Sequence, residues 1–459
     1  PSEESISEYK KTFDSENEFN QIREKIYQEV ISNLEKNWQN EKFFEVDAPT
    51  GSGKTLTLLG SAFKLREKLR EEKSRSPKII YALPFISIIQ QNYEVFKDVI
   101  EESTDQVGND ILLEHHHLAD EVFAVNGEEV NYSQSSFLIE NWYSEIVVTT
   151  FYQLFNSVYT NKNHLLKKYN KLTDAIILID EIQAIPPSLF QSVRDLFKFL
   201  VEEFNTRVII GTATQPQLNR DDEKKENILT PTKLFSPTTS ERISRTDLDN
   251  YFNRYRLNTS YLGQDLTLKE LEELMVNHTD LDNLMVVLNT INSTKELYRN
   301  LKHDPGFREF DTIYLSTNIP PITRSRRIEK AKSMIKDDKK FILITTQLIE
   351  AGVDISLEAI IRDLAPLDKI VQAAGRTNRN NEKDHSQVFV VDLVDSNNDN
   401  RSFSSYVYDK ILLTRTKNML LENPEKIEEK ELYRDLLPEY FKKMINNEPQ
   451  GIFESSDGN

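Results

Sequence analysis

The fold-deciding stretch is APTGSGKT, Ala48–Thr55, which follows the run FFEVD (43–47) and precedes the helical pattern LTLLGSAFKL (56–65). Small residues between a strand and a helix let backbone amides turn inward around a phosphate, and the helix N-terminus adds positive potential. Lys54 would reach the β- and γ-phosphates of a nucleotide, and the Thr55 hydroxyl would bind Mg²⁺. The rest of the cradle is Thr50, Gly51, Ser52 and Gly53. This pattern predicts a site for ATP with Mg²⁺ as cofactor.

An acidic partner for this loop lies in AIILIDEIQ, residues 175–183. Asp180 follows a run of apolar residues, which is typical of the end of a buried strand. Asp180 would hold Mg²⁺ through water, and Glu181 would orient or deprotonate the attacking water. Two adjacent acids at a strand end can also mark an ordinary turn. Together with the phosphate loop, however, the pair predicts an ATPase.

Short β-branched runs alternate with helical patterns along most of the chain, which is typical of βαβ units and parallel sheets. The expected strands of the first half are 43–49, 78–84, 145–150, 175–181 and 207–213. Those of the second half are 283–289, 312–317, 340–346, 358–364 and 387–393. A polar, charged stretch at 217–249 separates the two sets. The pattern predicts two similar α/β domains in tandem.

Charge and composition limit the classes of function. The 459 residues include 57 basic and 75 acidic ones, for a net charge of −18. This charge argues against a nucleic-acid binder held by a global positive field, but not against local contacts to phosphates. Residues 323–340 carry a local charge of +5 (eight basic and three acidic residues), most simply as a solvated helix face.

The absence of cysteine excludes disulfides, thiol nucleophiles and cysteine-ligated zinc. No apolar run approaches the roughly 18 residues that span a bilayer. A cytoplasmic protein without membrane contact is therefore expected. Because the chain begins with Pro1, we also expect it to be a processed or excised part of something longer.

Two further motifs lie in the second half. QAAGRTNR, Gln372–Arg379, places Gly375, Arg376 and Arg379 on the helix expected after the strand 358–364. Two arginines three residues apart share a helix face and could reach a γ-phosphate across a cleft, although such a pair is commonly surface decoration. TTQLIEAGVDI, Thr345–Ile355, follows another strand and supplies hydroxyls, Gly352 and Asp354.

These motifs occur in the order found in superfamily 2 helicases, and the chain resembles that superfamily over roughly residues 20–395. Within it, the chain resembles the CRISPR-associated helicase of type I systems. The more specific strings are YALPFISIIQQN (81–92), VVTTFYQLF (147–155), LIDEIQAIPP (178–187) and RDLAPLDKIVQAAGRTNR (362–379). Gln183 departs from the DEAD and DEAH endings but agrees with the CRISPR helicases.

The resemblance implies two tandem RecA-like domains that bind ATP between them and thread single-stranded DNA in the 3′ to 5′ direction. The expected organisation is a leader (1–20), a first ATPase domain (21–218), a linker (219–249), a second domain (250–396) and a short helical C-terminal extension (397–459).

By this resemblance, several sets of residues acquire expected roles. Catalysis falls to Lys54, Asp180, Glu181, Gln372, Arg376 and Arg379. Nucleotide binding adds Gly352 and Asp354 to the cradle, with Gln21 and Arg23 as candidates for the adenine base, although both could be merely exposed helical side chains. The DNA backbone would contact Pro84, Phe85, Thr149, Thr150, Asn289, Thr290, Ser316, Thr317 and Thr345. Several of these hydroxyls could equally be helix caps. Gln183, Thr212 and Thr214 would couple hydrolysis to DNA grip.

The expected function is an ATP-dependent single-stranded DNA translocase and helicase of type I CRISPR interference, recruited by a target-bound surveillance complex. The usual HD nuclease of such systems is not evident, so we expect it as a separate subunit or a missing upstream domain. The seven histidines form one run, His115–His117, and four scattered single residues. Two alternatives remain open at this point, a nucleic-acid-gated ATPase clamp without strand separation and an RNA helicase of the same superfamily.

Overall fold

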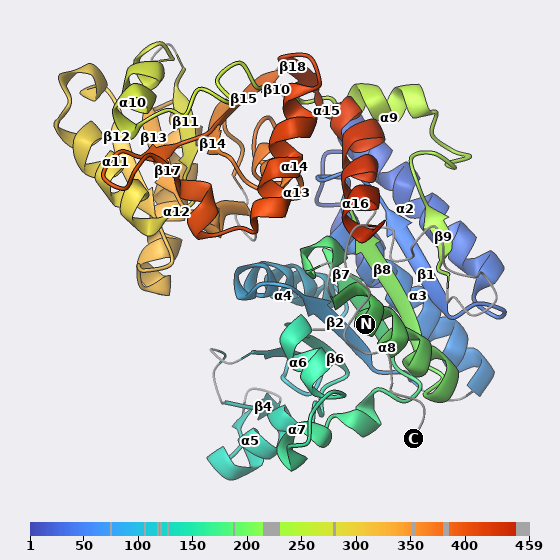
Figure 1. Ribbon diagram of the computed structural model, residues 1–459. Coiled ribbons are helices and arrows are strands. Elements are labelled where there is room, and N and C mark those ends of the chain that lie inside the picture. Colours follow the sequence, from blue (N-terminus) through green and yellow to red (C-terminus); the bar gives the residue numbers. More distant parts are fainter. Residues whose placement is uncertain are drawn as a thin grey trace, which may run out of the picture. The chain divides into compact units, whose positions relative to one another are not determined.

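The structure is a computed structural model that describes the chain except residues 74–75, 105–106, 117–118, 120–121, 126–127, 187–188, 214–229, 279–280, 351–354, 380–384 and 447–459. The chain forms two compact units, Pro1–Leu248 with Phe441–Asn459, and Asp249–Tyr440. Each unit contains one seven-stranded, mainly parallel sheet with helices around it (Figure 1). The prediction of two tandem α/β domains is therefore confirmed.

The sheet of the first unit has the strand order β3-β6-β2-β7-β8-β1-β9, and all neighbouring strands are parallel. Its strands are β1 (Phe43–Asp47), β2 (Ile79–Leu83), β3 (Leu112–His115), β6 (Ile146–Thr150), β7 (Ile176–Asp180), β8 (Arg207–Thr212) and β9 (Thr232–Phe235). Asp47 is in register with Thr212, and Asp180 with Gly211. The carboxyl ends of β1, β8 and β7 thus meet at one edge, where open α/β sheets bind ligands.

Helices cover both faces of this sheet, which explains why its central strands are uninterrupted apolar runs. On one face, α3 (Lys54–Lys73) packs against β7 and β8, and α2 (Glu18–Asn37) packs against α3. Tyr81 of β2 contacts Phe96 of α4 (Ile86–Glu101) on this face, with the ring centroids 4.9 Å apart. On the other face, α8 (Phe190–Glu203) shares a core with Ile80, Ile177 and Val208.

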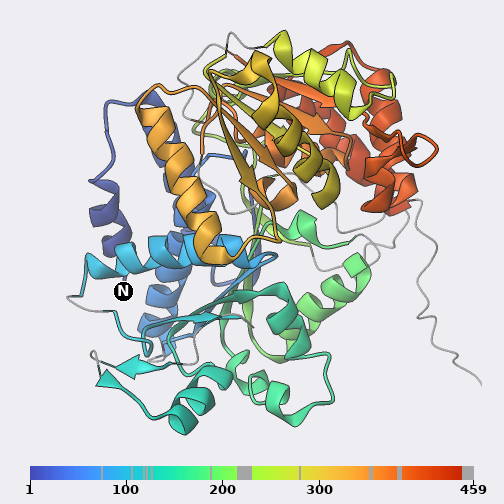
Figure 2. The same cartoon turned by 90° about the vertical axis from the view of Figure 1, so that its left-hand side faces the viewer.

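The remaining elements of the first unit are peripheral. They are α1 (Glu3–Lys10), β4 (Ala124–Val125), β5 (Glu128–Glu129), α5 (Tyr132–Glu140), α6 (Phe151–Asn156), α7 (Asn163–Leu166), η1 (Tyr169–Lys171) and η2 (Ile182–Ala184). The β4–β5 hairpin and helices α5 to α7 lie toward the β3–β6 edge of the sheet (Figures 1 and 2). Strand β9 was not predicted, because its residues lie inside the polar stretch 217–249.

The sheet of the second unit has the order β12-β13-β11-β14-β15-β10-β18, with only β18 antiparallel to its neighbour. Its strands are β10 (Tyr255–Asn258), β11 (Asn283–Val287), β12 (Asp311–Leu315), β13 (Phe341–Thr345), β14 (Ala359–Asp363), β15 (Ser386–Val391) and β18 (Lys426–Glu428). All ten strands predicted for the two halves are thus present. Residues 397–440 are part of this unit, because β18 completes its sheet.

The helices of the second unit include α10 (Leu268–Val276), α11 (Ile291–His303), α12 (Pro321–Lys336), α13 (Leu367–Ala374) and α14 (Lys410–Leu421). Shorter elements are η5 (Pro305–Phe307), η6 (Gln347–Glu350), β16 (Val394–Asp395), β17 (Arg401–Ser402), η7 (Phe403–Tyr406), α15 (Glu429–Glu431) and η8 (Leu432–Leu436). The chain passes between the units in α9 (Arg245–Tyr251) and α16 (Leu437–Asn446).

The basic stretch 323–340 forms most of α12, a long helix in yellow-orange in Figure 2. Lys330 pairs with Asp311 at 3.0 Å and Lys332 with Glu329 at 3.0 Å, and all four side chains are partly or largely solvent-exposed. The stretch is therefore the solvated helix face that its charge pattern indicates. Among the described residues, no helix is long and apolar enough to cross a membrane.

Glu45 on β1 makes the stability of the first unit dependent on pH. Burial, followed by the nearby Asp47, raises the pKa of Glu45 to about 7 from 4.5, against the opposing effect of Lys233. The folded state therefore binds more protons than the unfolded state between these pH values, and the free energy of unfolding falls as the pH rises through that range.

Glu45→Gln removes this ionisation. We expect its free energy of unfolding, relative to wild type, to increase by about 2 kcal/mol between pH 4.5 and pH 8. Urea unfolding of both proteins at the two pH values measures this change, with Glu16→Gln in an exposed loop as control. A difference between Glu45→Gln and wild type that does not vary with pH would contradict the prediction.

Candidate active site

The loop after β1 has the backbone of a phosphate cradle. Gly51 and Gly53 have φ angles of 86° and 82°, in the left-handed region that glycine adopts at little cost. The Ser52 N–H donates to the Pro49 carbonyl at 3.2 Å, and the Ala48 N–H donates to the Thr212 carbonyl at 3.0 Å. The loop is thus turned tightly and fixed to the end of β8.

Lys54 begins α3 and is only 8% exposed. Its Nζ donates to the carbonyls of Ala48 (2.8 Å) and Pro49 (3.1 Å), the first two residues of the loop motif. The buried Ser52 Oγ has no hydrogen-bond partner among the described residues. A buried hydroxyl without a partner in a glycine-rich cradle fits an anionic ligand such as a phosphate.

Asp180 and Thr55, the predicted Mg²⁺ ligands, both act on the Tyr81 hydroxyl. That hydroxyl donates to Asp180 Oδ2 at 2.6 Å, and Thr55 opposes the rise in the pKa of Tyr81 that burial causes. Asp180 is 4% exposed, and burial, followed by the charge of Glu181, raises its pKa to about 6, while Lys54 opposes the shift. A buried carboxylate beside a threonine hydroxyl offers the oxygen ligands that Mg²⁺ prefers.

Gly211 allows the close approach of β8 to this carboxylate. A Cβ atom at Gly211 would lie 2.6 Å from Leu58 Cδ1 and 3.0 Å from Asp180 Oδ1. Any larger residue at this position would therefore require the Leu58 or Asp180 side chain to shift.

Glu181 has an unusual backbone, with φ of +59°. Left-handed conformations are uncommon for residues other than glycine and are found at functional sites. Here the conformation lets the Glu181 N–H donate to Asp180 Oδ1 at 3.0 Å. The Glu181 carboxylate accepts from Gln183 Nε2, and Gln183 Oε1 accepts from Thr212 Oγ1 at 3.2 Å. A continuous chain thus joins the predicted base to two predicted coupling residues, while Thr214 lies outside the described residues.

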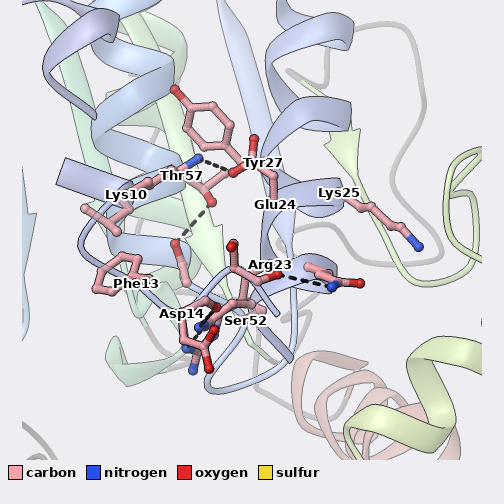
Figure 3. Close-up of a pocket in the computed structure, with 14 residues that line it drawn as sticks. Lys10, Phe13, Asp14, Arg23, Glu24, Lys25, Tyr27, Ser52 and Thr57 are labelled. Carbon is pink, nitrogen blue, oxygen red and sulfur yellow. Dashed lines mark hydrogen bonds and ion pairs between the residues drawn. The ribbon is translucent and has the colours of Figure 1, made fainter. Parts of the chain in front are cut away.

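A cavity of about 470 Å³ adjoins the cradle (Figure 3). It is lined by residues of α1 and the turn after it, of α2, of the phosphate loop and of α3, among them Phe13, Gln21, Arg23, Tyr27, Ser52 and Gly53. Arg23 Nε donates to the Gly51 carbonyl at 2.8 Å, and Gln21 Nε2 donates to the Ser15 carbonyl at 3.1 Å. The two residues predicted to recognise the base thus line a cavity beside the phosphates' predicted position.

The second unit corrects one prediction about the arginines. Helix α13 ends at Ala374, so Arg376 and Arg379 lie beyond it and not on one helix face. The segment instead forms an isolated parallel bridge between Thr377 and Leu357, which lies just before β14, and Asn378 has a φ of 43°. Glycine at position 375 and the left-handed Asn378 explain why the helix does not continue.

The other residues of this unit that were predicted to act on the nucleotide lie near the segment that carries Arg376 and Arg379, or lie outside the described residues. Gln372 on α13 accepts from Lys369 Nζ at 3.2 Å. The Arg379 N–H donates to Ser356 Oγ at 3.0 Å, which fixes the arginine-bearing segment against the residues before β14. Gly352 and Asp354 lie outside the described residues.

The predicted DNA contacts of the first unit lie at strand ends. Pro84 and Phe85 join β2 to α4, and Phe85 is 42% exposed. Thr150 accepts from the Gln153 N–H at 3.1 Å as the cap of α6. The buried Thr149 donates through Oγ1 to the His115 carbonyl at 2.8 Å.

The predicted DNA contacts of the second unit lie at the carboxyl ends of β11, β12 and β13. Thr290 caps α11 by accepting from the Ser293 N–H at 3.1 Å. Thr345 donates through Oγ1 to the Thr346 carbonyl at 3.0 Å, and Thr317 is exposed. Ser316 is fully buried, and its Oγ has no partner among the described residues. The Asn289 side chain is buried.

The histidine run is structural where the structure describes it. Trp142 Nε1 donates to His115 Nδ1 at 3.2 Å, and burial, followed by Lys168, lowers the pKa of His115 to about 3. His116 contacts Glu114 at 2.8 Å, and His117 lies outside the described residues. No cluster of three or more His, Cys, Asp or Glu side chains suited to a metal occurs in the described part of the chain.

Sequence reasoning missed Tyr81 and the α1 side of the cavity. Tyr81 reads as one more large residue of a buried strand, although a tyrosine there needs a partner for its hydroxyl. That need was the one available signal. Phe13 lies in a polar leader, and nothing in the sequence pattern places it near the phosphate loop.

Two families match parts of the chain. Residues 24–222 match the DEAD/DEAH box helicase family, and residues 280–382 match the family described as CRISPR-associated nuclease/helicase Cas3, C-terminal. A CRISPR-associated nuclease/helicase Cas3 of Haloferax volcanii is 29% identical over 84% of this chain and 50% of its own length. One of Methanothermobacter thermautotrophicus is 24% identical over 59% of this chain and 32% of its own length. The chain thus spans about half or less of the curated relatives it matches.

Solved structures show the same fold. The crystal structure of T. fusca Cas3 with ATP has a TM-score of 0.68 at 17% identity, covering 96% of this chain and 53% of that one. The Mycobacterium smegmatis helicase Lhr, bound to single-stranded DNA and AMP-PNP, has a TM-score of 0.51 at 14% identity, covering 79% of this chain and 45% of that one.

Proposed function

We propose that this chain is a CRISPR-associated helicase of superfamily 2 that hydrolyses ATP and translocates 3′ to 5′ along single-stranded DNA in type I interference against foreign DNA. The observation that carries the proposal is the geometry around Tyr81, whose hydroxyl donates to Asp180 of β7 and is influenced by Thr55 of the phosphate loop. These two groups would hold Mg²⁺, which would neutralise charge on the phosphates.

The side chains around this site have separate tasks in the proposed reaction. Lys54 would exchange its contacts with the Ala48 and Pro49 carbonyls for the β- and γ-phosphates of ATP. Glu181 would accept a proton from the attacking water. The positive charge of Arg376 and Arg379 would stabilise the transferring γ-phosphate once the two units close around ATP.

We propose that DNA is gripped through its backbone. The exposed Phe85 and Thr317 and the partly exposed Thr290 are apolar or small polar groups that would contact sugar and phosphate without reading bases, whereas Thr149, Ser316 and Thr345 are fully buried. This mode of contact is compatible with a net charge of −18, because it needs no global positive field. Hydrolysis would be linked to this grip through the Glu181–Gln183–Thr212 chain of hydrogen bonds.

The partners of this activity follow from its class. A helicase needs an exposed single strand to load on, so we propose recruitment by a target-bound surveillance complex. The relatives are named nuclease/helicase and are about twice as long as the matched region or longer. We therefore propose that DNA cleavage depends on an HD nuclease, either a separate subunit or an upstream domain.

A strand-displacement assay tests the proposed function. Partial duplexes with a 3′ or a 5′ single-stranded tail, built from DNA or from RNA, are incubated with the chain, ATP and Mg²⁺. We expect ATP-dependent displacement on the 3′-tailed DNA substrate, and Lys54→Ala as control should abolish it. DNA-stimulated hydrolysis without displacement would indicate a clamp, and displacement confined to RNA would indicate an RNA helicase.

A further inference from the structure

A buried polar network lies at the carboxyl ends of β11 and β14 in the second unit. It consists of Arg362 and Asp363, both 0% exposed, and Asn289, 3% exposed. Charged side chains are placed in a protein interior at a cost unless they are paired and hydrogen-bonded. The contacts of these three side chains therefore show what the network holds together.

Asn289 is the centre of the network. Its amide nitrogen donates to Asp363 Oδ2 and to the Leu364 carbonyl, both at 2.7 Å, and its amide oxygen accepts from Arg362 at 2.7 Å. Both N–H groups are thus engaged inside the protein. The sequence motif places Asn289 among the DNA contacts, whereas its side chain is oriented toward the interior.

The network connects the two kinds of functional segment in this unit. On one side, Asn289 precedes Thr290, and its carbonyl accepts from Gln347 Nε2 at 2.9 Å, which ties it to the segment after Thr345. Thr290 and Thr345 are candidate DNA contacts. On the other side, Asp363 and Leu364 lead directly into α13, which precedes Arg376 and Arg379.

Further contacts hold the network in one arrangement. Asp363 Oδ1 accepts from the Leu393 N–H at 3.1 Å. Arg362 also donates to the Asp363 carbonyl at 2.7 Å and to the Tyr408 hydroxyl at 3.1 Å. A displacement of the Asn289–Thr290 turn would therefore move the start of α13, because few of these contacts can be lost without leaving a buried polar group unpaired.

We propose that Arg362, Asn289 and Asp363 couple DNA binding to ATP hydrolysis by transmitting the position of the DNA-contacting turn to the arginine-bearing segment. All three are positioning residues and touch neither DNA nor nucleotide with these side chains. The inference rests on the proposed function. The first unit has a proposed coupling route through Gln183 and Thr212, and this network would be a second route, inside the second unit.

Asp363→Asn is the informative variant, because it keeps the shape of the side chain and removes its ability to accept through both oxygens. Burial raises the pKa of Asp363 to about 7, so loss of the charge itself costs little in folding, and the main cost is the loss of one of the two hydrogen bonds that the carboxylate accepts. We expect the ratio of ATPase rates with and without oligo-dT to fall about tenfold. The rate without DNA and the Kd for labelled oligo-dT, measured by fluorescence anisotropy, should stay near wild type.

Asp392→Asn is the matched control. Asp392 is 4% exposed, follows the adjacent strand β15, and accepts from Ser402 Oγ at 2.8 Å and Lys417 Nζ at 2.6 Å. It is a buried, hydrogen-bonded acid of the same sheet edge without a contact to Asn289 in its hydrogen bonds. We expect the ratio of its ATPase rates with and without oligo-dT to equal that of wild type, even if the midpoint temperature of its thermal unfolding falls.

Arg362→Lys provides a second variant, since lysine keeps the charge but cannot make the forked contacts of the guanidinium. It should lower the ratio in the same way. Retention of the wild-type ratio by Asp363→Asn or by Arg362→Lys, an equal loss in Asp392→Asn, or a loss explained by a weaker Kd would overturn the inference. A wild-type ATPase that oligo-dT does not stimulate would instead refute the proposed function, and the coupling route with it.

Discussion

Glu181→Gln is expected to lower ATP turnover by about 10²-fold or more while ATP binding stays near that of wild type. Glutamine keeps the size of the side chain and can still contact Gln183, but it cannot accept a proton from the attacking water. Because the Glu181 N–H, and not its carboxylate, contacts Asp180, the Mg²⁺ ligands should keep their positions.

Phosphate release in the presence of oligo-dT measures turnover, and titration with a fluorescent ATP analogue measures binding. Glu202→Gln, at an exposed position of α8, is the control and should match wild type in both assays. Near-normal turnover by Glu181→Gln would show that another group activates the water. Loss of ATP binding would show that Glu181 contributes to binding ATP before hydrolysis and not only to activating the water.

Arg376→Ala and Arg379→Ala are each expected to abolish the stimulation of ATP hydrolysis by single-stranded DNA with little change in ATP affinity. The physical reason is that the cradle, Lys54 and Asp180 all belong to the first unit, so they would bind ATP without the arginines. The arginines belong to the second unit and would contribute only in the transition state, after closure.

Steady-state ATPase rates with and without oligo-dT test this expectation, and the rate with DNA should fall to within about twofold of the rate without it. Arg434→Ala is a suitable control, since Arg434 pairs at the surface with Asp435 at 2.8 Å. Full, DNA-independent activity of the wild-type chain, or strong stimulation of both alanine variants, would show that closure does not gate hydrolysis through these arginines.

Local sequence was sufficient for the elements that depend on local chemistry. The ten strands were predicted because runs such as IIYAL and IILID are apolar on both faces, as the central strands of covered parallel sheets must be. The cradle was predicted because glycine at 51 and 53 permits the backbone that the structure shows. Strand β9 escaped prediction because it is a short edge strand within a polar segment, where the pattern is weak.

Helix length was less predictable than helix presence. The spacing of Arg376 and Arg379 predicted that both lie on one face of a helix. A helix ends, however, where its backbone groups form hydrogen bonds with residues outside the helix. Here the Leu357 N–H donates to the Arg376 carbonyl at 3.0 Å, and these two residues belong to different segments of the sequence. Glycine at 375 was the only local signal of this end.

The sequence by itself determined the phosphate loop and the acidic strand end, because each depends on residues within one strand–turn–helix segment. The two-sheet architecture was predictable because such segments recur in two sets along the chain. Only the tertiary structure decided which distant side chains meet. Tyr81 contacts Asp180, and Asn289 joins Arg362 to Asp363, because parallel strands bring their carboxyl ends to one edge whatever their separation along the chain. Hydrogen bonds between such residues depend on strand order and register, which no local pattern of residue types specifies.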